Sequence, residues 1–570
     1  MKLIGKDNFA ETDNLFFLPE TKRDFSSVDI LLVTGDAYLD HPSFGIAIIA
    51  RVLENAGYKI AIWSQPDYRN AEQLKKLPEV RLFIGITAGN IDSVVSNYTG
   101  TRSRRKDDAY SVDGNPFFPQ GHQKRPDRAT IVYTSFLKQR YKNIPIVLGG
   151  IEASLRRFAH YDYVQDKIRH SVLLDSKADI ISYGMGEKSM VEIAKRIEEK
   201  RSLKGIEGTV IKIKPEECEG LTALPSYEEV TSDKEKFLEM TALIEANMVH
   251  ESACGLYQKD GMNIVASFRP QPLLTQKELD DVYALPFRRN FPEYCERVPA
   301  WKMIQHSVTS HRGCFGRCSF CAIASHQGPL VSRRSEESII AEVKKIALLE
   351  NFHGTISDVG GPTANMYASF CKIGGCKDPK CLFPKICPNL QMNQADYVDL
   401  LFKIKNLPEI KHVFINSGIR YDMALEDKNA AEQMICNFTS GHLKIAPEHF
   451  CDDILRLMRK PPAKEFERFI AFFEQIKKKN YLNFYMLPYL ILSHPGSTND
   501  SARALGNFLL KHNISTRQYQ DFTPTPQTIS TAMFVSGKNM QHKDINIVHY
   551  SAANNPQRKI LENMLRYKKK

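Results

Sequence analysis

The chain has 570 residues, too many for a single hydrophobic core, and its 42% hydrophobic content can fill about three domains of ordinary size. The 77 basic and 66 acidic residues give a net charge of +11, which permits a polyanionic partner but is far below the charge density of a dedicated nucleic-acid-binding protein. No run of about 18 uncharged apolar residues is present and the first residues do not resemble a signal peptide, so we expect a cytoplasmic protein without membrane association.

Short apolar runs that end at or near a glycine dominate the first part of the chain. They predict buried parallel strands, and residues 44–56, which stop at Gly57, have the spacing of an intervening helix. The predicted strands are 29–35, 59–63, 81–86, 144–150 and 179–184. This alternation predicts an α/β fold with a Rossmann-like domain over residues 1–225.

Residues 99–130 interrupt this pattern with a basic segment rich in Gly, Pro and Asp. Its length is unusual for a passive loop, and it is either a solvated insertion or a loop that contacts phosphate. The basic residues are Arg102, Arg104, Arg105, Lys106, Lys124, Arg125 and Arg128.

The second part of the chain begins after residues 226–300, a proline-punctuated stretch that we expect to bridge two domains. Strands are predicted at 304–311, 354–359, 412–417, 442–446, 482–492 and 517–523, and helices at 335–350, 394–405, 464–479 and 499–512. Six βα repeats predict a partial (β/α)6 barrel over residues 301–530, with functional residues at the carboxyl ends of its strands. Residues 531–570 form a C-terminal extension.

Three cysteines directly follow the first strand of this series. Cys314, Cys318 and Cys321 have the spacing CxxxCxxC, which offers three thiolates to one inorganic group. An iron–sulfur cluster held in this way keeps one iron open for an external ligand, whereas a structural zinc is closed by four protein ligands. A zinc site completed by His311 or His326 is the alternative.

The motif Cys314, Cys318, Phe320, Cys321 resembles the signature of radical S-adenosylmethionine enzymes. The resemblance implies a [4Fe–4S] cluster on the three cysteines and S-adenosylmethionine on its open iron, cleaved by one electron to a 5′-deoxyadenosyl radical. It also implies an external electron donor of the flavodoxin or ferredoxin type. By this resemblance, the residues expected to bind the cofactor are Phe320, Gly360, Gly361, Ser417 and Arg420, with a surface salt bridge as the alternative for Arg420. Catalytic residues are not identified.

The chain is more closely similar to the YgiQ family of radical S-adenosylmethionine proteins. The similar segments are Val33–Gly45, Leu148–Arg157, Tyr183–Glu187, His311–Cys318 and Asp358–Asn365. The resemblance implies that the N-terminal domain is like cobalamin-binding domains. However, Asp40, His41 and Gly45 do not reproduce the DxHxxG pattern whose histidine binds cobalt, so we expect little cobalamin binding.

A second group of four cysteines lies in a loop rich in Gly, Pro and Lys. Four thiolates suit a tetrahedral metal or a closed cluster, so we expect zinc or a second iron–sulfur cluster, with unliganded thiols as the alternative. The group consists of Cys371, Cys376, Cys381 and Cys387.

The sequence therefore favours a radical S-adenosylmethionine enzyme whose substrate is unknown. The net charge of +11 and the basic segment 99–130 extend this hypothesis to a phosphate-bearing substrate such as RNA. The alternative is a non-catalytic nucleic-acid-binding protein stabilised by an iron–sulfur cluster or zinc.

Overall fold

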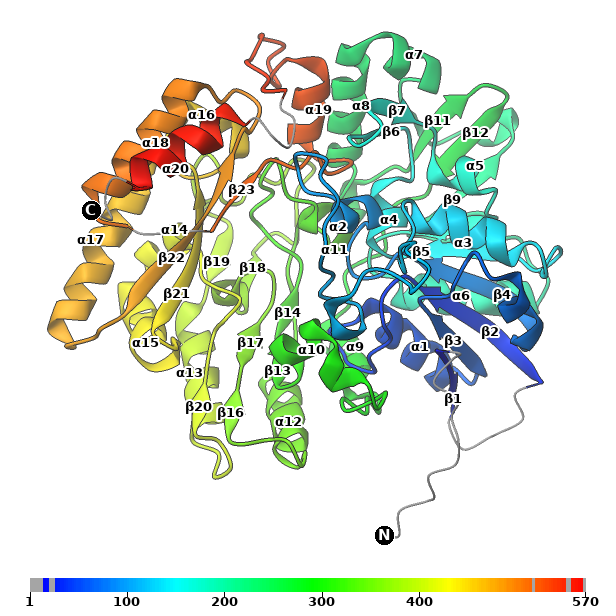
Figure 1. Ribbon diagram of the computed structural model, residues 1–570, viewed down its shortest axis with the longest axis horizontal. Helices are drawn as coiled ribbons and strands as arrows, with labels where there is room; N and C mark the ends of the chain where they lie inside the picture. Colours follow the sequence, from blue (N-terminus) through cyan, green and yellow to red (C-terminus); the bar gives the residue numbers. More distant parts are fainter. Residues whose placement is uncertain (1–13, 20–25, 515–517, 550–554, 567–570) are drawn as a thin grey trace.

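The computed structural model of the chain describes residues 14–19, 26–514, 518–549 and 555–566. Figure 1 shows two halves side by side, one containing the first twelve strands and the other containing the strands from β13 onward. Both halves mix helices and strands, so the expected α/β class is confirmed. Within the described residues, no helix combines the length and apolar character needed to cross a bilayer.

A ten-stranded sheet organises the N-terminal half, in the order β1-β3-β2-β4-β5-β8-β9-β12-β11-β10. The five strands from β3 to β8 in this order are parallel, and Val33 of β2 lies opposite both Trp63 and Ile86. These are the five strands that the apolar runs predict. The bounds are β1 Leu15–Leu18, β2 Ser27–Thr34, β3 Ile60–Ser64, β4 Glu79–Thr87, β5 Ile146–Gly149, β8 Ile180–Ser182, β9 Thr209–Ile213, β10 Thr222–Ala223, β11 Leu256–Asp260 and β12 Asn263–Ser267.

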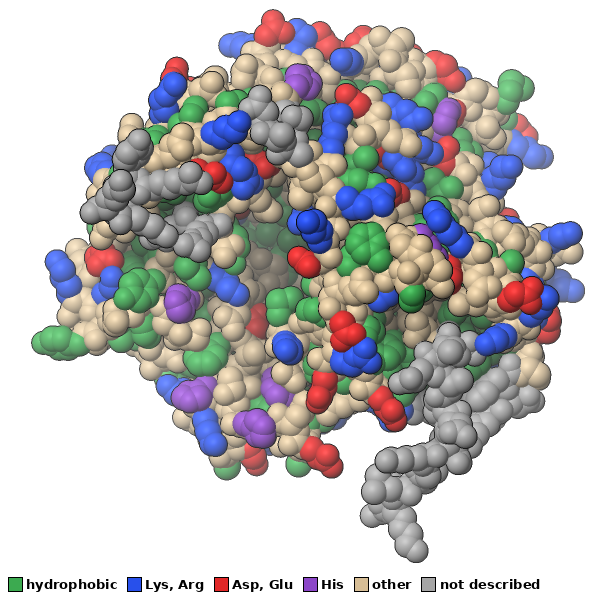
Figure 2. Space-filling view, viewed as in Figure 1, with side chains coloured by type: hydrophobic (Ala, Val, Ile, Leu, Met, Phe, Trp, Pro, Cys, Tyr) green, Lys and Arg blue, Asp and Glu red, His purple; other side chains and the backbone are tan. Residues whose placement is uncertain are grey.

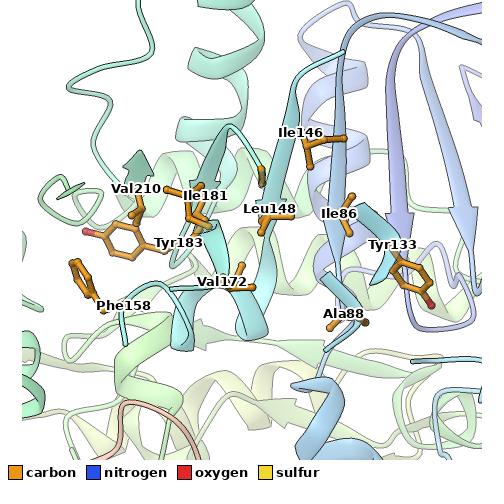
Figure 3. Packing of buried hydrophobic residues seen from close by; sticks show 14 of the residues in the cluster. Ile86, Ala88, Tyr133, Ile146, Leu148, Phe158, Val172, Ile181, Tyr183 and Val210 are labelled. Atoms are coloured by element: carbon orange, nitrogen blue, oxygen red, sulfur yellow. The ribbon is translucent and has the colours of Figure 1, made fainter. Parts of the chain in front are cut away.

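Both faces of this sheet are buried, because neighbouring residues of a strand point to opposite faces. Leu31 and Val33 of β2 belong to one apolar cluster, whereas Ile30 and Leu32 belong to the other. Helices α3 (Ala129–Leu137) and α5 (Val172–Ser176) cover the first face, and α1 (Gly45–Asn55) and α6 (Glu187–Glu198) cover the second. Figure 3 shows the first cluster, in which strand residues pack beside Tyr133 and Val172.

The segment expected to bridge the two halves also contributes to the N-terminal sheet. After helices α7 (Tyr227–Ser232) and α8 (Lys234–Ala246), the hairpin β11–β12 pairs with β9 through β12, and α9 (Gln276–Ala284) follows. Residues 226–300 are therefore partly an extension of the sheet.

Short parallel strands organise the second half. β13 (Ser307–Thr309) pairs with β17 (Asp358–Gly360), β16 (Thr355–Ile356) with β20 (His412–Val413), and β21 (His442–Glu448), β22 (Tyr485–Leu492) and β23 (Tyr519–Asp521) form one sheet. The predicted helices are confirmed to within three residues at either end. Their bounds are α12 Glu336–Ala347, α13 Gln394–Lys405, α17 Ala463–Lys479 and α18 Asn499–Lys511. Ser335 caps α12 by accepting a hydrogen bond from the Ser338 amide.

After β23 the chain returns to the N-terminal half through α19 (Ile529–Ser536). Ile529, Ala532 and Met533 are part of the same buried cluster as Ile86, and the helix packs against α8. A final helix, α20 (Pro556–Arg566), packs against α18 in the second half. The two halves are thus joined by packing as well as by the connecting chain.

Candidate functional site

The cysteine loop lies between the short strand β14 (His311–Arg312) and helix α11 (Ile323–Gln327). Its first residue, Gly313, has a φ of +83°, and a Cβ at this position would collide with the Leu330 carbonyl, so the turn requires glycine. The amide of Cys314 donates to the Gly328 carbonyl at 3.2 Å. These constraints fix the start of the loop.

Two of the three cysteine side chains lie beside the space left by the missing side chain of Gly316. A Cβ on Gly316 would lie 3.2 Å from Cys314 Sγ and 3.7 Å from Cys318 Sγ. The pKa of Cys321 is raised to about 12, mainly by burial and to a smaller extent by the nearby Cys318 and Cys314 thiolates. The sulfur atoms of Cys314 and Cys318 thus lie close to the space beside Gly316, and their effect on Cys321 places its thiol in the same neighbourhood.

Arg420 contacts the cysteine loop. Its Nη1 lies 3.9 Å from Cys318 Sγ, and its Nε and Nη2 donate to the two carboxylate oxygens of Asp422 at 2.9 and 2.6 Å. The guanidinium is buried, so this salt bridge is internal and not the surface pair considered as an alternative. A fixed positive charge beside the sulfur atoms favours thiolates, and it lowers the burial-raised pKa of Cys314.

Phe320 packs below the loop. It belongs to an apolar cluster with Met458 and Phe522, and its ring centroid lies 6.3 Å from that of His494. His494 Nε2 in turn hydrogen-bonds to Ser530 Oγ at 2.6 Å, and that hydroxyl also contacts Ser319 Oγ at 2.8 Å. Phe320 thus anchors the loop to the second half of the molecule.

The glycines after β17 allow close packing of neighbouring strand ends. A Cβ on Gly360 would collide with Ser417 Oγ, and one on Gly361 would lie 2.7 Å from His311 Nε2. Ser417 donates through its amide and hydroxyl to Asp358 Oδ1 at 3.0 and 3.1 Å. The structure therefore brings the predicted residues Gly360, Gly361 and Ser417 together.

Asp358, which accepts both hydrogen bonds from Ser417, is a carboxyl group whose pKa is changed by burial. Burial raises its pKa to about 6, above the value of 3.8 expected for an exposed aspartate. A raised carboxyl pKa means that the fold prefers the protonated form, so this contribution to stability is complete below pH 3.8 and is lost as the pH rises through about 6. We expect Asp358→Asn to be more stable than the wild type at neutral pH and to lose this advantage on acidification.

The measurement is the urea midpoint of both proteins at about pH 5 and about pH 7.5. The amide oxygen of asparagine can still accept from Ser417, so the variant is a fair comparison. If the urea midpoints of the two proteins change equally between these pH values, the pKa of Asp358 is not raised.

A cavity of about 710 Å³ joins the two halves. Strand ends of the N-terminal sheet line one side, including Thr34, Thr87 and residues 149–150 and 184–187, as the glycine-terminated strands predict. The other side is lined by Asp358, Gly360, Gly361, Ser417 and Lys444. On the face in Figure 2 the surface is hollowed where the two halves meet.

Comparisons with known proteins agree with this arrangement. The family described as Radical SAM N-terminal matches residues 17–307, and the Radical SAM superfamily matches residues 308–509. A UPF0313 protein of Thermotoga neapolitana is 43% identical over 539 residues, covering 91% of this chain and 94% of the relative. A UPF0313 protein of Methanosarcina acetivorans is 43% identical over 551 residues, covering 90% of this chain and 73% of the relative.

The chain belongs to the UPF0313 family, also called YgiQ. It is a radical S-adenosylmethionine enzyme whose substrate is unknown, which confirms both predictions from the sequence. Among solved structures, the radical S-adenosylmethionine methyltransferase TsrM from Kitasatospora setae, with tryptophan and an S-adenosylmethionine analogue bound, is similar with a TM-score of 0.52. At 12% identity, covering 95% of this chain and 89% of that one, the likeness shows the fold alone.

Two residues of this UPF0313 protein that the sequence analysis left without a role meet at the cavity. Glu187 begins α6 in the N-terminal half and forms a buried ion pair with Arg312 of β14, directly before the cysteine loop. Within the described residues, Glu187 Oε2 and Arg312 Nη2 have no hydrogen-bond partner. Both residues lie in the segments that resemble the family, but only the fold shows that they are in contact.

His41 lies away from the cavity. Its Nδ1 accepts from the Ser43 amide at 3.1 Å, and its Nε2 is 2.8 Å from Arg289 Nη1. The side chain is fully buried, and Ser43, not His41, lines the cavity. Both ring nitrogens are therefore engaged by the protein.

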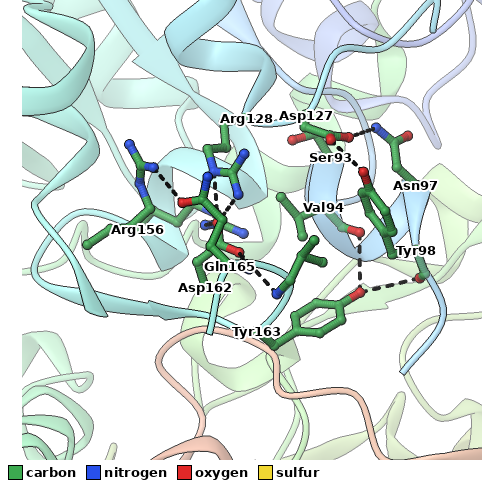
Figure 4. Close-up of polar contacts among 12 residues, drawn as sticks. Ser93, Val94, Asn97, Tyr98, Asp127, Arg128, Arg156, Asp162, Tyr163 and Gln165 are labelled. Carbon is green, nitrogen blue, oxygen red and sulfur yellow. Dashed lines mark hydrogen bonds and ion pairs between the residues drawn. The ribbon is translucent and has the colours of Figure 1, made fainter. Parts of the chain in front are cut away.

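Several basic residues of the segment 99–130 are paired with carboxylates. Arg125 contacts Asp36 at 2.5 Å and Asp108 at 3.1 Å, and Arg128 contacts Asp162 at 2.6 Å. Figure 4 shows Arg128 and Arg156 on either side of Asp162. These arginines hold the segment to the N-terminal half, and Figure 2 shows basic and acidic side chains interspersed over the visible face.

The four remaining predicted ligands occupy the loop between β18 (Ser369–Cys371) and β19 (Leu390–Met392). Cys381 is buried, Cys371 and Cys387 are partly buried, and Cys376 is exposed. In the described ranges, no three His, Cys, Asp or Glu side chains are arranged to bind a single metal ion.

Proposed function

We propose that Cys314, Cys318 and Cys321 hold a [4Fe–4S] cluster whose open iron binds S-adenosylmethionine. The observation that carries this proposal is the position of the Cys314 and Cys318 sulfur atoms beside Gly316, where any side chain would crowd them. When bound, such a cluster supplies the single electron that cleaves S-adenosylmethionine reductively to a 5′-deoxyadenosyl radical. The electron comes from an external donor of the flavodoxin or ferredoxin type.

The residues around the loop divide into two roles in this proposal. Gly360, Gly361 and Ser417 line the cavity and position S-adenosylmethionine, because the glycines allow a ligand to approach the backbone closely. Arg420 and Phe320 support the cysteine loop from its buried side, the former by its charge and the latter by packing.

We propose that the N-terminal half is a Rossmann-like domain over residues 1–225, extended by residues 226–300. The parallel order β3-β2-β4-β5-β8 with helices on both faces supports it. A partial (β/α)6 barrel over residues 301–530 is supported by its parallel strand pairs and intervening helices. Residues 531–570 are the C-terminal extension.

The substrate in this proposal occupies the cavity above the cysteine loop. A volume of about 710 Å³ suits a small molecule or one nucleotide-sized group of a larger substrate. The free oxygen of Glu187 and the free Nη2 of Arg312 offer one acceptor and one donor for a polar group. The net charge of +11 supports a phosphate-bearing substrate such as RNA, but the paired arginines of residues 99–130 do not add to that support.

The test is anaerobic reconstitution with iron and sulfide, followed by dithionite and S-adenosylmethionine. We expect 5′-deoxyadenosine to form in proportion to the amount of cluster. Absence of this product from a protein with an intact cluster would contradict the proposal and favour the non-catalytic alternative.

Cobalamin is a separate question, because a TsrM structure from Kitasatospora setae is described with cobalamin and a [4Fe–4S] cluster bound. We propose that the cavity of this chain positions substrate, and we expect little retention of hydroxocobalamin through anaerobic gel filtration. His41→Ala should leave the spectrum of any retained corrin unchanged, because both ring nitrogens already contact Ser43 and Arg289. Stoichiometric corrin binding, or a spectrum altered by His41→Ala, would overturn these expectations.

We also propose that Cys371, Cys376, Cys381 and Cys387 form a second metal site, for zinc or an iron–sulfur cluster. Four thiolates form a complete ligand shell without any other residue.

A further inference from the structure

The loop that carries the second cysteine group is folded back on itself. Its ends are paired as antiparallel strands, with Cys371 opposite Leu390. The amide of Cys387 donates to the Cys381 carbonyl at 2.8 Å, and the amide of Leu390 donates to the Cys387 carbonyl at 2.9 Å. These bonds place three of the four cysteines within one compact turn.

Two thiols of this group lie close together. Cys381 and Cys387 belong to one apolar cluster and are joined by a backbone hydrogen bond. A single ion holds four sulfur atoms at about 2.3 Å from its centre, whereas a four-iron cluster holds its thiolates farther apart. Within the described residues, no three His, Cys, Asp or Glu side chains are arranged to bind a single ion, so a cluster, with its wider thiolate spacing, is the group considered for these four cysteines.

The second group adjoins the first cysteine loop. Cys381 and Cys387 pack in the same apolar cluster as Cys314 and its neighbour Phe315. Arg317, within the first loop, donates to the Pro379 carbonyl at 2.7 Å and lies 3.4 Å from the Asp378 carboxylate. The two cysteine groups therefore meet within one apolar cluster.

The outer side of the second group is basic and partly apolar. Phe370 and Ile373 are exposed to 45% and 58%, which is high for large apolar side chains. Exposed lysines surround them at Lys372, Lys377, Lys380 and Lys385, of which Lys380 is paired with Asp378. Such a surface is complementary to an acidic protein with an apolar contact area.

We propose that Cys371, Cys376, Cys381 and Cys387 hold a second [4Fe–4S] cluster that relays electrons from an acidic redox protein, docked on the surrounding lysines, to the first cluster. This inference rests on the proposed function of Cys314, Cys318 and Cys321. One electron leaves the reduced carrier and reduces the second cluster, and the same electron then reduces the first cluster and regenerates the second. No bond forms or breaks at the relay, and the carrier is the only reductant.

Metal analysis tests the site itself. After anaerobic reconstitution with iron(II) and sulfide, the wild type should hold about eight iron atoms per chain, four from each cluster. Cys371→Ser/Cys376→Ser should hold about four, and so should Cys314→Ala/Cys318→Ala/Cys321→Ala, because each variant loses one cluster. Cys254→Ser, at an exposed cysteine outside both groups, should keep the full content.

Several outcomes would overturn the second cluster without affecting the first. If the wild type holds only about four iron atoms and the triple variant holds none, the second group does not bind iron. One zinc ion per chain that is lost in Cys371→Ser/Cys376→Ser would identify a structural zinc site instead. In both cases, continued formation of 5′-deoxyadenosine by the wild type would still support the proposed function.

Electron delivery is tested with two donors, reduced flavodoxin as an acidic carrier and dithionite as a small reductant. Lys372→Glu/Lys377→Glu should slow reduction by flavodoxin at least about tenfold at low ionic strength, because electrostatic steering is reversed. Reduction by dithionite and the iron content should not change. The matched control, Lys234→Glu/Lys259→Glu, reverses two exposed charges on the N-terminal half. Flavodoxin should reduce this variant at the wild-type rate. Equal flavodoxin rates for the two charge-reversal variants would exclude this surface as the point of electron entry.

Discussion

Alanine at any one of Cys314, Cys318 or Cys321 is expected to abolish formation of 5′-deoxyadenosine. Two thiolates cannot hold a cluster with one open iron in a fixed position, so S-adenosylmethionine loses its binding site. The measurement is product formation after anaerobic reconstitution, with dithionite as the reductant so that electron delivery is not limiting.

The matched control is Cys254→Ala, at an exposed cysteine far from the loop in sequence, which should retain full product formation. The fold of each variant should survive, because the loop is also held by backbone bonds such as that between Cys314 and Gly328. Wild-type yields from any one of the three alanine variants would refute the assignment of the cluster ligands.

The second large effect is expected from Glu342→Ala, a change in stability. Glu342, on α12, forms buried ion pairs with both Arg289 and Arg334. Arg289 also contacts His41 of the N-terminal half and donates to the Ser307 carbonyl of β13. Removing the carboxylate leaves two buried guanidinium groups without their counter-charge, at an expected cost of about 3–5 kcal/mol.

The change should appear as a lower urea midpoint than that of the wild type under anaerobic conditions. Glu350→Ala, at an exposed position just after the same helix, should leave the midpoint unchanged. An unfolding midpoint for Glu342→Ala equal to that of Glu350→Ala would show that the buried network does not stabilise the fold.

Local patterns predicted most of the helices and parallel strands. The helix at 394–405 was found with the predicted bounds, because apolar residues recur along one face over three turns. The hairpin of β11 and β12 was missed although its signal is local. Gly261 has a φ of +55° and with Met262 forms a two-residue loop, so that Asp260 faces Asn263 across the hairpin.

The contacts around the site could not be predicted in the same way. Arg420 and Cys318 are separated by 102 residues, and His41 and Arg289 by 248, so neither contact follows from the spacing within a motif. The sequence indicated which residue types hold the cofactor, but the fold decides which of them face the cavity. Phe320 and Gly360 both belong to the predicted site, and only Gly360 lines the cavity.

The return of the chain through α19 bears on how the protein is made. A ribosome releases the N-terminal half long before residues 529–536, yet Ile529 and Met533 complete the apolar core of that half. Ser530 in the same helix contacts Ser319 and His494, next to the cysteine loop. The first half therefore remains unfinished until residues 529–536 have been made, and during that interval the cysteine loop lacks the contact between Ser319 and Ser530.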